Sequence, residues 1–223
     1  GSVSAALLGL LVACLGGSGP VAAQVVQGTV IQTIDASLWS PPAPDTAGII
    51  YRPETGQLLT CDSEVDEMTI FAGVNLWTHS RTGVVASTAV TTAYSNEPTG
   101  ITWDPAGGRL FISDDDKKRI FEVKFGPDGV WNTADDTRTS LRGYDQAGCD
   151  DLEDVAYNPF NGHLYVSSGK SQEVCEIAPG PNGVFSNAYV YGDDVVTTFS
   201  TAAWGILDPE GIVYDPFWNT LVL

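Results

Sequence analysis

Gly100-Ile101-Thr102-Trp103-Asp104-Pro105 is one of four copies of a short pattern that decides the fold of this chain. The other copies are Gly48-Ile49-Ile50-Tyr51-Arg52-Pro53, Asp154-Val155-Ala156-Tyr157-Asn158-Pro159 and Gly211-Ile212-Val213-Tyr214-Asp215-Pro216. Their prolines, at positions 53, 105, 159 and 216, are 52, 54 and 57 residues apart, and a short turn and a second apolar stretch follow each copy. Self-similarity at such a period is the signature of a repeat architecture.

Each copy has the composition of four short strands, because apolar runs rich in β-branched and aromatic residues alternate with clusters of Gly, Pro, Asn and Asp. In the second copy we expect strands near residues 99–104, 109–113, 119–125 and 137–142. Four antiparallel strands that recur every ~40–55 residues are typical of a β-propeller blade, whereas ankyrin, TPR and leucine-rich repeats are shorter and partly helical. The sequence therefore predicts an all-β protein with a β-propeller fold.

The second copy also resembles a known family. Pro98-Thr99-Gly100 through Pro105, with Arg109-Leu110-Phe111-Ile112-Ser113-Asp114 and Arg119-Ile120-Phe121-Glu122-Val123, resembles the six-bladed propellers of the NHL and regucalcin/gluconolactonase-like group. The resemblance covers roughly residues 44–223 and implies a secreted bacterial propeller, but it implies no activity, since propellers host binding modules, lactonases, phytases and scaffolds alike. Such families close their ring with a strand from one terminus, which Val25 to Leu38 could supply.

The chain divides into three parts. Residues 1–23 read as a signal peptide, because the apolar run from Ala5 to Leu15 is too short for a membrane span and small residues precede Gln24. Residues 24–43 form an N-terminal strand and a Pro-rich linker, and residues 44–223 form the blades. Only three copies and half of a fourth are present, so we expect a fragment of three four-stranded blades and a partial fourth, truncated at its C-terminus.

Two interpretations of the N-terminal segment place the protein outside the cytoplasm. Cleavage before Gln24 yields a secreted or periplasmic protein, and a lipobox at Leu11-Val12-Ala13-Cys14 would instead make Cys14 a lipid anchor. Three cysteines remain after cleavage, namely Cys61, Cys149 and Cys175. Any two of them could form a disulfide and leave the third as a free thiol, and the alternative is that all three are buried, unpaired thiols. The net charge of −18, from 28 acidic and 10 basic residues, excludes nucleic acid as a natural partner.

Acidic residues recur three positions before the start of every copy of the pattern. The topology of a blade places these segments on the same face as the turns between its second and third strands, around the mouth of the central channel. Converging carboxylates repel one another unless a cation or proton lies among them, so the pattern predicts bound Ca²⁺, and the alternative is solvated turn residues. The predicted ligands at the channel mouth are Asp45, Glu97, Asp151, Glu153, Asp208 and Glu210, with Asp62, Glu64, Asp114, Asp115 and Asp116 on the neighbouring turns.

A second candidate calcium site lies in the loop between the third and fourth strands of the second copy. The loop Gly126 to Asp136 carries four carboxylate or amide side chains within nine residues, namely Asp128, Asn132, Asp135 and Asp136. Hard cations take six to eight oxygen ligands, often on a tight loop that contains Gly. The third copy repeats the motif as Gly180-Pro181-Asn182-Gly183 and reaches Asp193-Asp194. A plain hairpin loop is the alternative interpretation.

Catalytic motifs are scarce. His79 and His163 fall at unrelated positions of their copies, so neither suggests a triad. Gly169-Lys170-Ser171 imitates the end of a phosphate loop, but Leu164 stands where its first glycine belongs. The favoured hypothesis is a secreted calcium-binding propeller that acts as a binding or interaction module for an unidentified protein or small molecule at the channel face. The alternative is a Ca²⁺-dependent hydrolase of lactonase or phosphoesterase type, with its site at the channel mouth.

Overall fold

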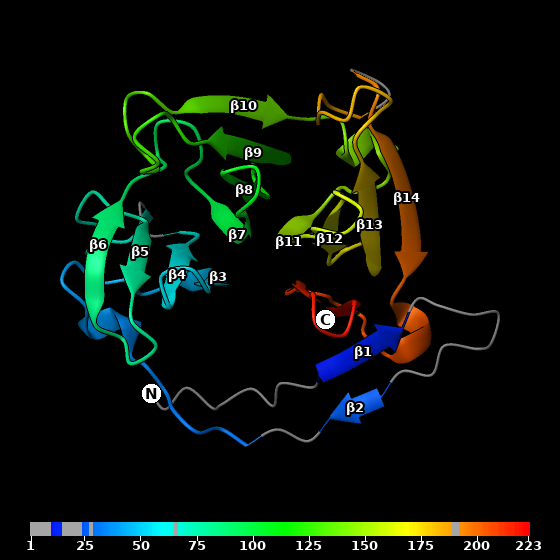
Figure 1. Ribbon diagram of the computed structural model, residues 1–223. Coiled ribbons are helices and arrows are strands. Elements are labelled where there is room, and N and C mark those ends of the chain that lie inside the picture. Colours follow the sequence, from blue (N-terminus) through cyan, green and yellow to red (C-terminus); the bar gives the residue numbers. More distant parts are fainter. Residues whose placement is uncertain (1–9, 15–23, 27–28, 65–66, 189–191) are drawn as a thin grey trace.

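The protein is an all-β propeller. The computed structural model describes residues 10–14, 24–26, 29–64, 67–188 and 192–223. Its strands form four sheets of four strands, paired antiparallel and arranged around a common centre (Figure 1). Helix is limited to short 3-10 turns such as η1 (Ala36–Leu38), η3 (Asp145–Ala147) and η4 (Ala202–Trp204). Within the described ranges, none of the helical segments has the length and apolar character needed to cross a membrane.

We number the sheets as blades one to four in the order of the repeats. Blade one contains β3 (Thr46–Arg52), β4 (Gln57–Asp62), β5 (Leu76–His79) and β6 (Val85–Ala89). Blade two contains β7 (Pro98–Asp104), β8 (Arg109–Asp114), β9 (Arg119–Lys124) and β10 (Thr137–Leu141). Blade three contains β11 (Leu152–Tyr157), β12 (Leu164–Ser168), β13 (Glu173–Ala178) and β14 (Val195–Ser200). The strands expected in the second copy are thus confirmed to within a residue or two.

Blade four is assembled from two distant parts of the chain. Its strand order is β15 (Val213–Asp215), β16 (Thr220–Val222), β1 (Leu10–Cys14) and β2 (Gln24–Val26), so the fourth repeat supplies two strands and the N-terminal segment two (Figure 1). The signal peptide stays a prediction, and its residues 1–9 and 15–23 lie outside the described part. Cleavage before Gln24 would remove β1, the partner of β16.

The N-terminal strand covers less of Val25 to Leu38 than expected. Beyond β2, residues 29–35 form no strand and instead pass over blade one. Ile34 fills the space beside Gly83, and the Trp39 ring lies 6.1 Å from that of Trp77. Packing of these apolar side chains on blade one explains why the segment does not continue as a paired strand.

The hydrophobic core lies between blades rather than within them. Side chains alternate between the two faces of each strand, so Phe111 packs toward blade three whereas Leu110 and Ile112 pack toward blade one. A further cluster joins blades three and four through Tyr165 and Tyr214. The four copies of the repeat line a central apolar cavity of about 450 Å³. Each blade is therefore buried by its neighbours.

One disulfide bond selects among the cysteine pairings that the sequence left open. Cys149, just before β11, is bonded to Cys175 on β13, so the bridge lies within blade three. Cys61 is a free, fully buried thiol whose Sγ accepts a hydrogen bond from the Gly48 amide at 3.3 Å. Burial raises the pKa of the Cys61 thiol.

Candidate metal centres

Acidic side chains from neighbouring blades meet on one face of the propeller, as the repeat predicts. The turn between the second and third strands of one blade approaches the segment that leads into the next blade. In this way Glu64 of blade one faces Glu97 of blade two, and Asp115 of blade two faces Asp151 of blade three. The prediction that these two sets of loops share a face is therefore confirmed by their contacts.

The tightest group joins blades two and three. Carboxylate oxygens of Asp115, Asp151 and Glu153 all lie within 4.8 Å of one another. Gly169 lies beside them, because a Cβ at this position would be 2.7 Å from Asp208 Oδ1, 3.1 Å from Asp151 Oδ2 and 3.4 Å from Glu153 Oε1. The missing side chain thus leaves a small cradle among three carboxylates. We call Asp115, Asp151, Glu153, Asp208 and Glu210 the channel-mouth cluster.

A lysine neutralises part of this cluster. The Lys170 ammonium forms an ion pair with Asp151 Oδ1, and the Lys170 amide donates a hydrogen bond to Asp151 Oδ2 at 2.7 Å. The lysine side chain is 71% exposed, so it can move into solvent, whereas that of Asp151 is 4% exposed. The sequence pattern alone did not assign Lys170 to this cluster, although it lies in the turn between β12 and β13, at the repeat position that Asp116 holds in blade two.

The environment of the glutamates on this face favours their neutral form. Burial, followed by repulsion from Asp116, Asp115, Asp114 and Glu64, raises the pKa of Glu97 to about 7. Burial, followed by repulsion from Glu210, Asp151 and Asp115, likewise raises the pKa of Glu153 to about 7. Burial also raises the pKa of Glu210, whereas the Lys170 contacts outweigh burial and lower that of Asp151. A cation in the cluster would relieve this repulsion.

The predicted channel-mouth ligands do not all join one group. Asp151, Glu153, Asp208 and Glu210 come together around Gly169, as expected. Glu97 instead lies among Glu64 and the acidic turn of residues 114–116. The contacts of Asp45 are within blade one: its amide donates to Asp62 Oδ2 at 2.8 Å and its Oδ2 accepts from Ser63 Oγ at 3.4 Å. A continuous ring of four equivalent acids is therefore not formed.

The loop after β9 brings together three of its four predicted ligands. Oxygens of Asp128, Asp135 and Asp136 lie within 4.8 Å of one another. Most of them already accept hydrogen bonds: Asp136 accepts from the amides of Gly126 and Thr133 at 3.0 and 3.1 Å, and Asp128 Oδ1 from that of Val130 at 2.8 Å. These bonds organise the hairpin without a metal. Asn132 adopts a left-handed φ of 61°, which places it at the bend.

The third repeat uses the same design for its loop. Asp194 accepts hydrogen bonds from the amides of Ser186 and Asn187 and from the Tyr144 hydroxyl, at 2.8–3.1 Å. Gly126 and Gly180 each lie against the first aspartate of the pair, where a Cβ would be 2.2 Å from Asp135 Cγ or 2.4 Å from Asp193 Cγ. Because both loops share these structural contacts, the second aspartate of each pair is first of all a loop organiser.

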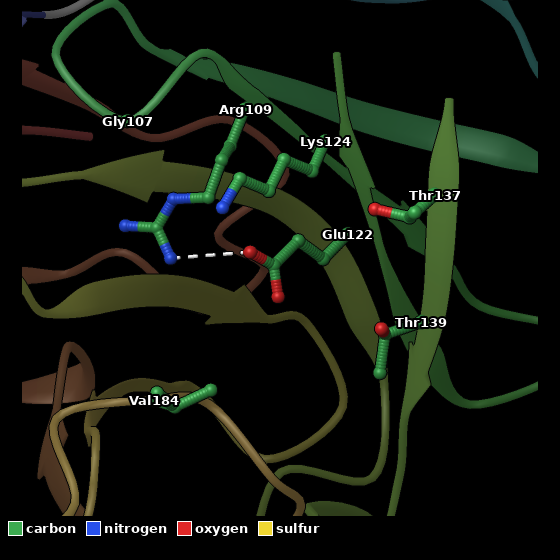
Figure 2. A pocket seen from close by; sticks show the side chains of 7 residues that line it. All are labelled: Gly107, Arg109, Glu122, Lys124, Thr137, Thr139 and Val184. Carbon is green, nitrogen blue, oxygen red and sulfur yellow. Dashed lines mark hydrogen bonds and ion pairs between the residues drawn. The ribbon is translucent and has the colours of Figure 1, made fainter. Parts of the chain in front are cut away.

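A different pocket lies between blades two and three. Its volume is about 350 Å³. Figure 2 shows residues of its lining, which include Arg109, Glu122, Lys124 and two threonines of β10. The Arg109 guanidinium bonds to Glu122 at 3.1 Å and to Asp104 at 2.7 Å, and it lies 5.1 Å from the centre of the Phe111 ring. These contacts occupy both the charge and the face of the guanidinium. The guanidinium also lies 5.8 Å from the centre of the Tyr157 ring and 5.9 Å from that of the Phe185 ring, both of blade three. Arg109 therefore links blade two to blade three rather than offering a free cation.

Comparison with known proteins identifies the family. The family model described as SdiA-regulated matches residues 26–215. Among curated proteins none matches this chain. Among solved structures, hydrazine synthase from Kuenenia stuttgartiensis is similar, with 13% sequence identity and a TM-score of 0.41. The match covers 80% of this chain and 50% of the hydrazine synthase chain, so this chain spans about half the length of that structure. The repeat that builds the blades lies almost entirely within the matched residues, and the chain belongs to the SdiA-regulated family.

Proposed function

We propose that this protein is a secreted, calcium-binding β-propeller that acts as a binding module, with Ca²⁺ held in the channel-mouth cluster. The observation that carries the proposal is the approach of Asp115, Asp151 and Glu153 oxygens to within 4.8 Å across two blades. Calcium prefers carboxylate oxygens in flexible sets of six to eight ligands. The Gly169 cradle offers room there, and the Lys170 ammonium marks a position that attracts a cation.

The channel-mouth cluster is a better candidate than the loop of Asp128, Asp135 and Asp136. The loop carboxylates are held by backbone amides of their own hairpin, which satisfies them without a metal. In the cluster, by contrast, burial and repulsion between carboxylates raise the pKa of Glu153 to about 7, so a bound cation would relieve that repulsion. We therefore assign the first calcium ion to the cluster.

The test compares thermal stability and calcium binding in two matched variants of the whole chain. Calcium at a hundredfold excess over Kd should add about 2.7 kcal/mol to the folding stability of the wild type, and a chelator should reverse the gain. Asp151→Asn with Asp208→Asn should abolish most of the gain, whereas Asp135→Asn should leave it. Equal calorimetric binding by the wild type and the cluster variant would remove the site.

The hydrolase alternative rests on one observation at the same place. A glutamate whose pKa is about 7, such as Glu153, suits a general base near neutral pH, and an adjacent Ca²⁺ would polarise a lactone or phosphoester. Assays with simple lactones and aryl phosphates in the presence of Ca²⁺ distinguish the two functions. Turnover that is lost in Glu153→Gln supports a hydrolase, and no turnover with intact calcium binding supports the binding module.

Export is supported by the cysteines. The Cys149–Cys175 disulfide is the kind of bond that persists in oxidising compartments and is rare in the cytosol. We infer that the chain is exported by the predicted signal peptide and processed before Gln24, with anchoring at Cys14 as the alternative. The mass of the mature N-terminus after expression in a bacterial host tests this inference: it begins at Gln24 in the first case and at a lipidated Cys14 in the second. We also propose that the protein is related to the NHL and regucalcin-like propellers and that its propeller has six blades.

A further inference from the structure

The seam between blades three and four differs from the seam between blades two and three. In the latter, Arg109 of blade two pairs with Asp104 and Glu122 of the same blade and lines the cavity of about 350 Å³. The repeat places His163 at the position of Arg109 and Asn158 at that of Asp104. The long Arg109 side chain is thus replaced by the shorter His163, and the carboxylate of Asp104 by the neutral amide of Asn158. The cavity at this seam, of about 300 Å³, is therefore lined by uncharged residues, which include Asn158, Asn161, Asn219, Tyr165, Tyr214 and Phe160.

The lining of this cavity carries no formal charge but many hydrogen-bonding groups. The Tyr165 hydroxyl donates to Glu176 Oε1 at 2.7 Å, and the same oxygen is 2.7 Å from His163 Nδ1, so the nearby carboxylate is already paired. Asn161 Nδ2 donates to the Tyr165 hydroxyl at 3.1 Å, and the Tyr214 hydroxyl donates to Asn219 Oδ1. Asn219 Nδ2 has no partner among the described residues. The cavity can therefore donate to and accept from a neutral ligand.

An exposed aromatic side chain lines the cavity at a position that the fold does not require to be aromatic, and two more precede the lining residue Asn219 in its turn. Phe160 is 70% exposed, and Phe217 and Trp218, beside Asn219, are 81% and 70% exposed. Blade two has Ala106 and Gly107 where blade three has Phe160 and Asn161, and the turn forms in both blades. Large exposed aromatic residues on turns of a rigid scaffold indicate recognition.

We propose that the cavity between blades three and four binds a neutral saccharide. A sugar ring combines an apolar face, which suits the exposed aromatic rings, with hydroxyl groups, which suit amide and phenol partners. The absence of charge in the lining, on a protein of net charge −18, selects against anionic glycans and gives no counter-ion for cationic ligands. Antiparallel strands place these turns on the face opposite the channel-mouth cluster, so the site is independent of calcium.

The experiment measures binding of the whole chain to an array of neutral gluco-, manno-, galacto- and chito-oligosaccharides, followed by titration calorimetry with the best ligand in the presence of a chelator. Phe160→Ala with Asn161→Gly copies the turn of blade two and should weaken binding at least tenfold. Asn219→Gly keeps the left-handed φ of 52° available, removes the amide, and should also weaken binding. The matched control is Glu54→Ala with Thr55→Gly, which makes the same change in the corresponding turn of blade one and should bind like the wild type.

Three outcomes overturn the proposal. The first is that no neutral oligosaccharide is retained, the second is that only charged glycans or an apolar detergent bind, and the third is that both cavity variants bind as tightly as the wild type. Equal melting temperatures of wild type and variants show that lost binding is not lost folding. Saccharide binding that survives the chelator supports this site whether or not the calcium proposal holds.

Discussion

The Asp154 carboxylate of blade three fills the space that Gly100 of blade two leaves by having no side chain. A Cβ on Gly100 would lie 2.2 Å from Asp154 Oδ1. Asp154 itself stands at the repeat position that glycine holds in the other three copies. Its oxygens accept hydrogen bonds from the amides of Val155 at 2.8 Å and of Ile212 at 3.0 Å, and Ile101 contributes a third. One side chain thereby joins the innermost segments of three blades.

Gly100→Ala should destabilise the protein by about 3 kcal/mol, because the new methyl group would overlap both the carboxylate and the backbone of Asp154. Gly211→Ala is the matched control. It occupies the same repeat position in blade four, and its Cβ would come no nearer than 4.0 Å to Asp154 Oδ2. Urea denaturation of the two variants measures the difference, and equal losses would contradict the proposed close approach.

Asp154 should make the protein less stable as the pH rises toward neutrality. Burial raises its pKa from 3.8 to about 7, so the folded state binds the proton more tightly than the unfolded state. Stability is therefore highest below pH ~4 for this group and falls by up to about 1.4 kcal/mol per pH unit until pH ~7. In chelator, the unfolding free energy at pH 5 minus that at pH 7.5 should be positive, and it should be smaller in Asp154→Asn. An unchanged difference would assign the pH dependence to other acids.

Lys170→Met should increase the affinity of the channel-mouth cluster for calcium severalfold. The substitution keeps an unbranched side chain, shorter by one atom, but removes the ammonium group that is paired with Asp151. A calcium ion then no longer competes with the Lys170 ammonium group for the Asp151 carboxylate. Titration calorimetry against Lys124→Met, a lysine that lines the separate pocket between blades two and three, is the measurement. Weaker or equal binding by Lys170→Met would mean that this lysine does not occupy the cation position.

Reduction of Cys149–Cys175 should destabilise the protein by about 3 kcal/mol, as expected for a bridge between residues 26 positions apart. Cys61 should stay unmodified by iodoacetamide in the native protein, because its thiol is buried and its pKa is raised. Mass spectrometry after alkylation, with and without urea, follows both events. Labelling of Cys61 under native conditions would show that the inner part of blade one opens readily.

The sequence predicted the fold well because the repeat combines three independent signals. Its glycine or aspartate, its alternating apolar residues and its proline recur in register, and each follows from the pleat and the turn of a strand pair. The assembly of blade four was harder to foresee. The pairing of β1 with β16 joins segments about 200 residues apart and depends on which edge is left unpaired, and no local pattern encodes this.

The candidate site was predicted in part. The repeat placed Asp151, Glu153, Asp208 and Glu210 on one face, because their loops share a direction. It did not separate Glu97 or Asp45 from them, since equivalent positions in a repeat acquire different neighbours from one seam to the next. The loop aspartates were recognised as a cluster, but their use as acceptors for backbone amides becomes visible only from the hairpin geometry.

The location of the core between blades has a consequence for cooperativity. Blade two contacts one hydrophobic cluster on each face, and its Arg109 also packs against the Tyr157 ring of blade three at 5.8 Å. Its central strands β8 and β9 cannot open without disrupting both clusters, so their amides should exchange with solvent only through global unfolding. The outer strands β6 and β14 contribute only partly buried side chains to the clusters and have no fully buried residue, so local fraying should release their amides first.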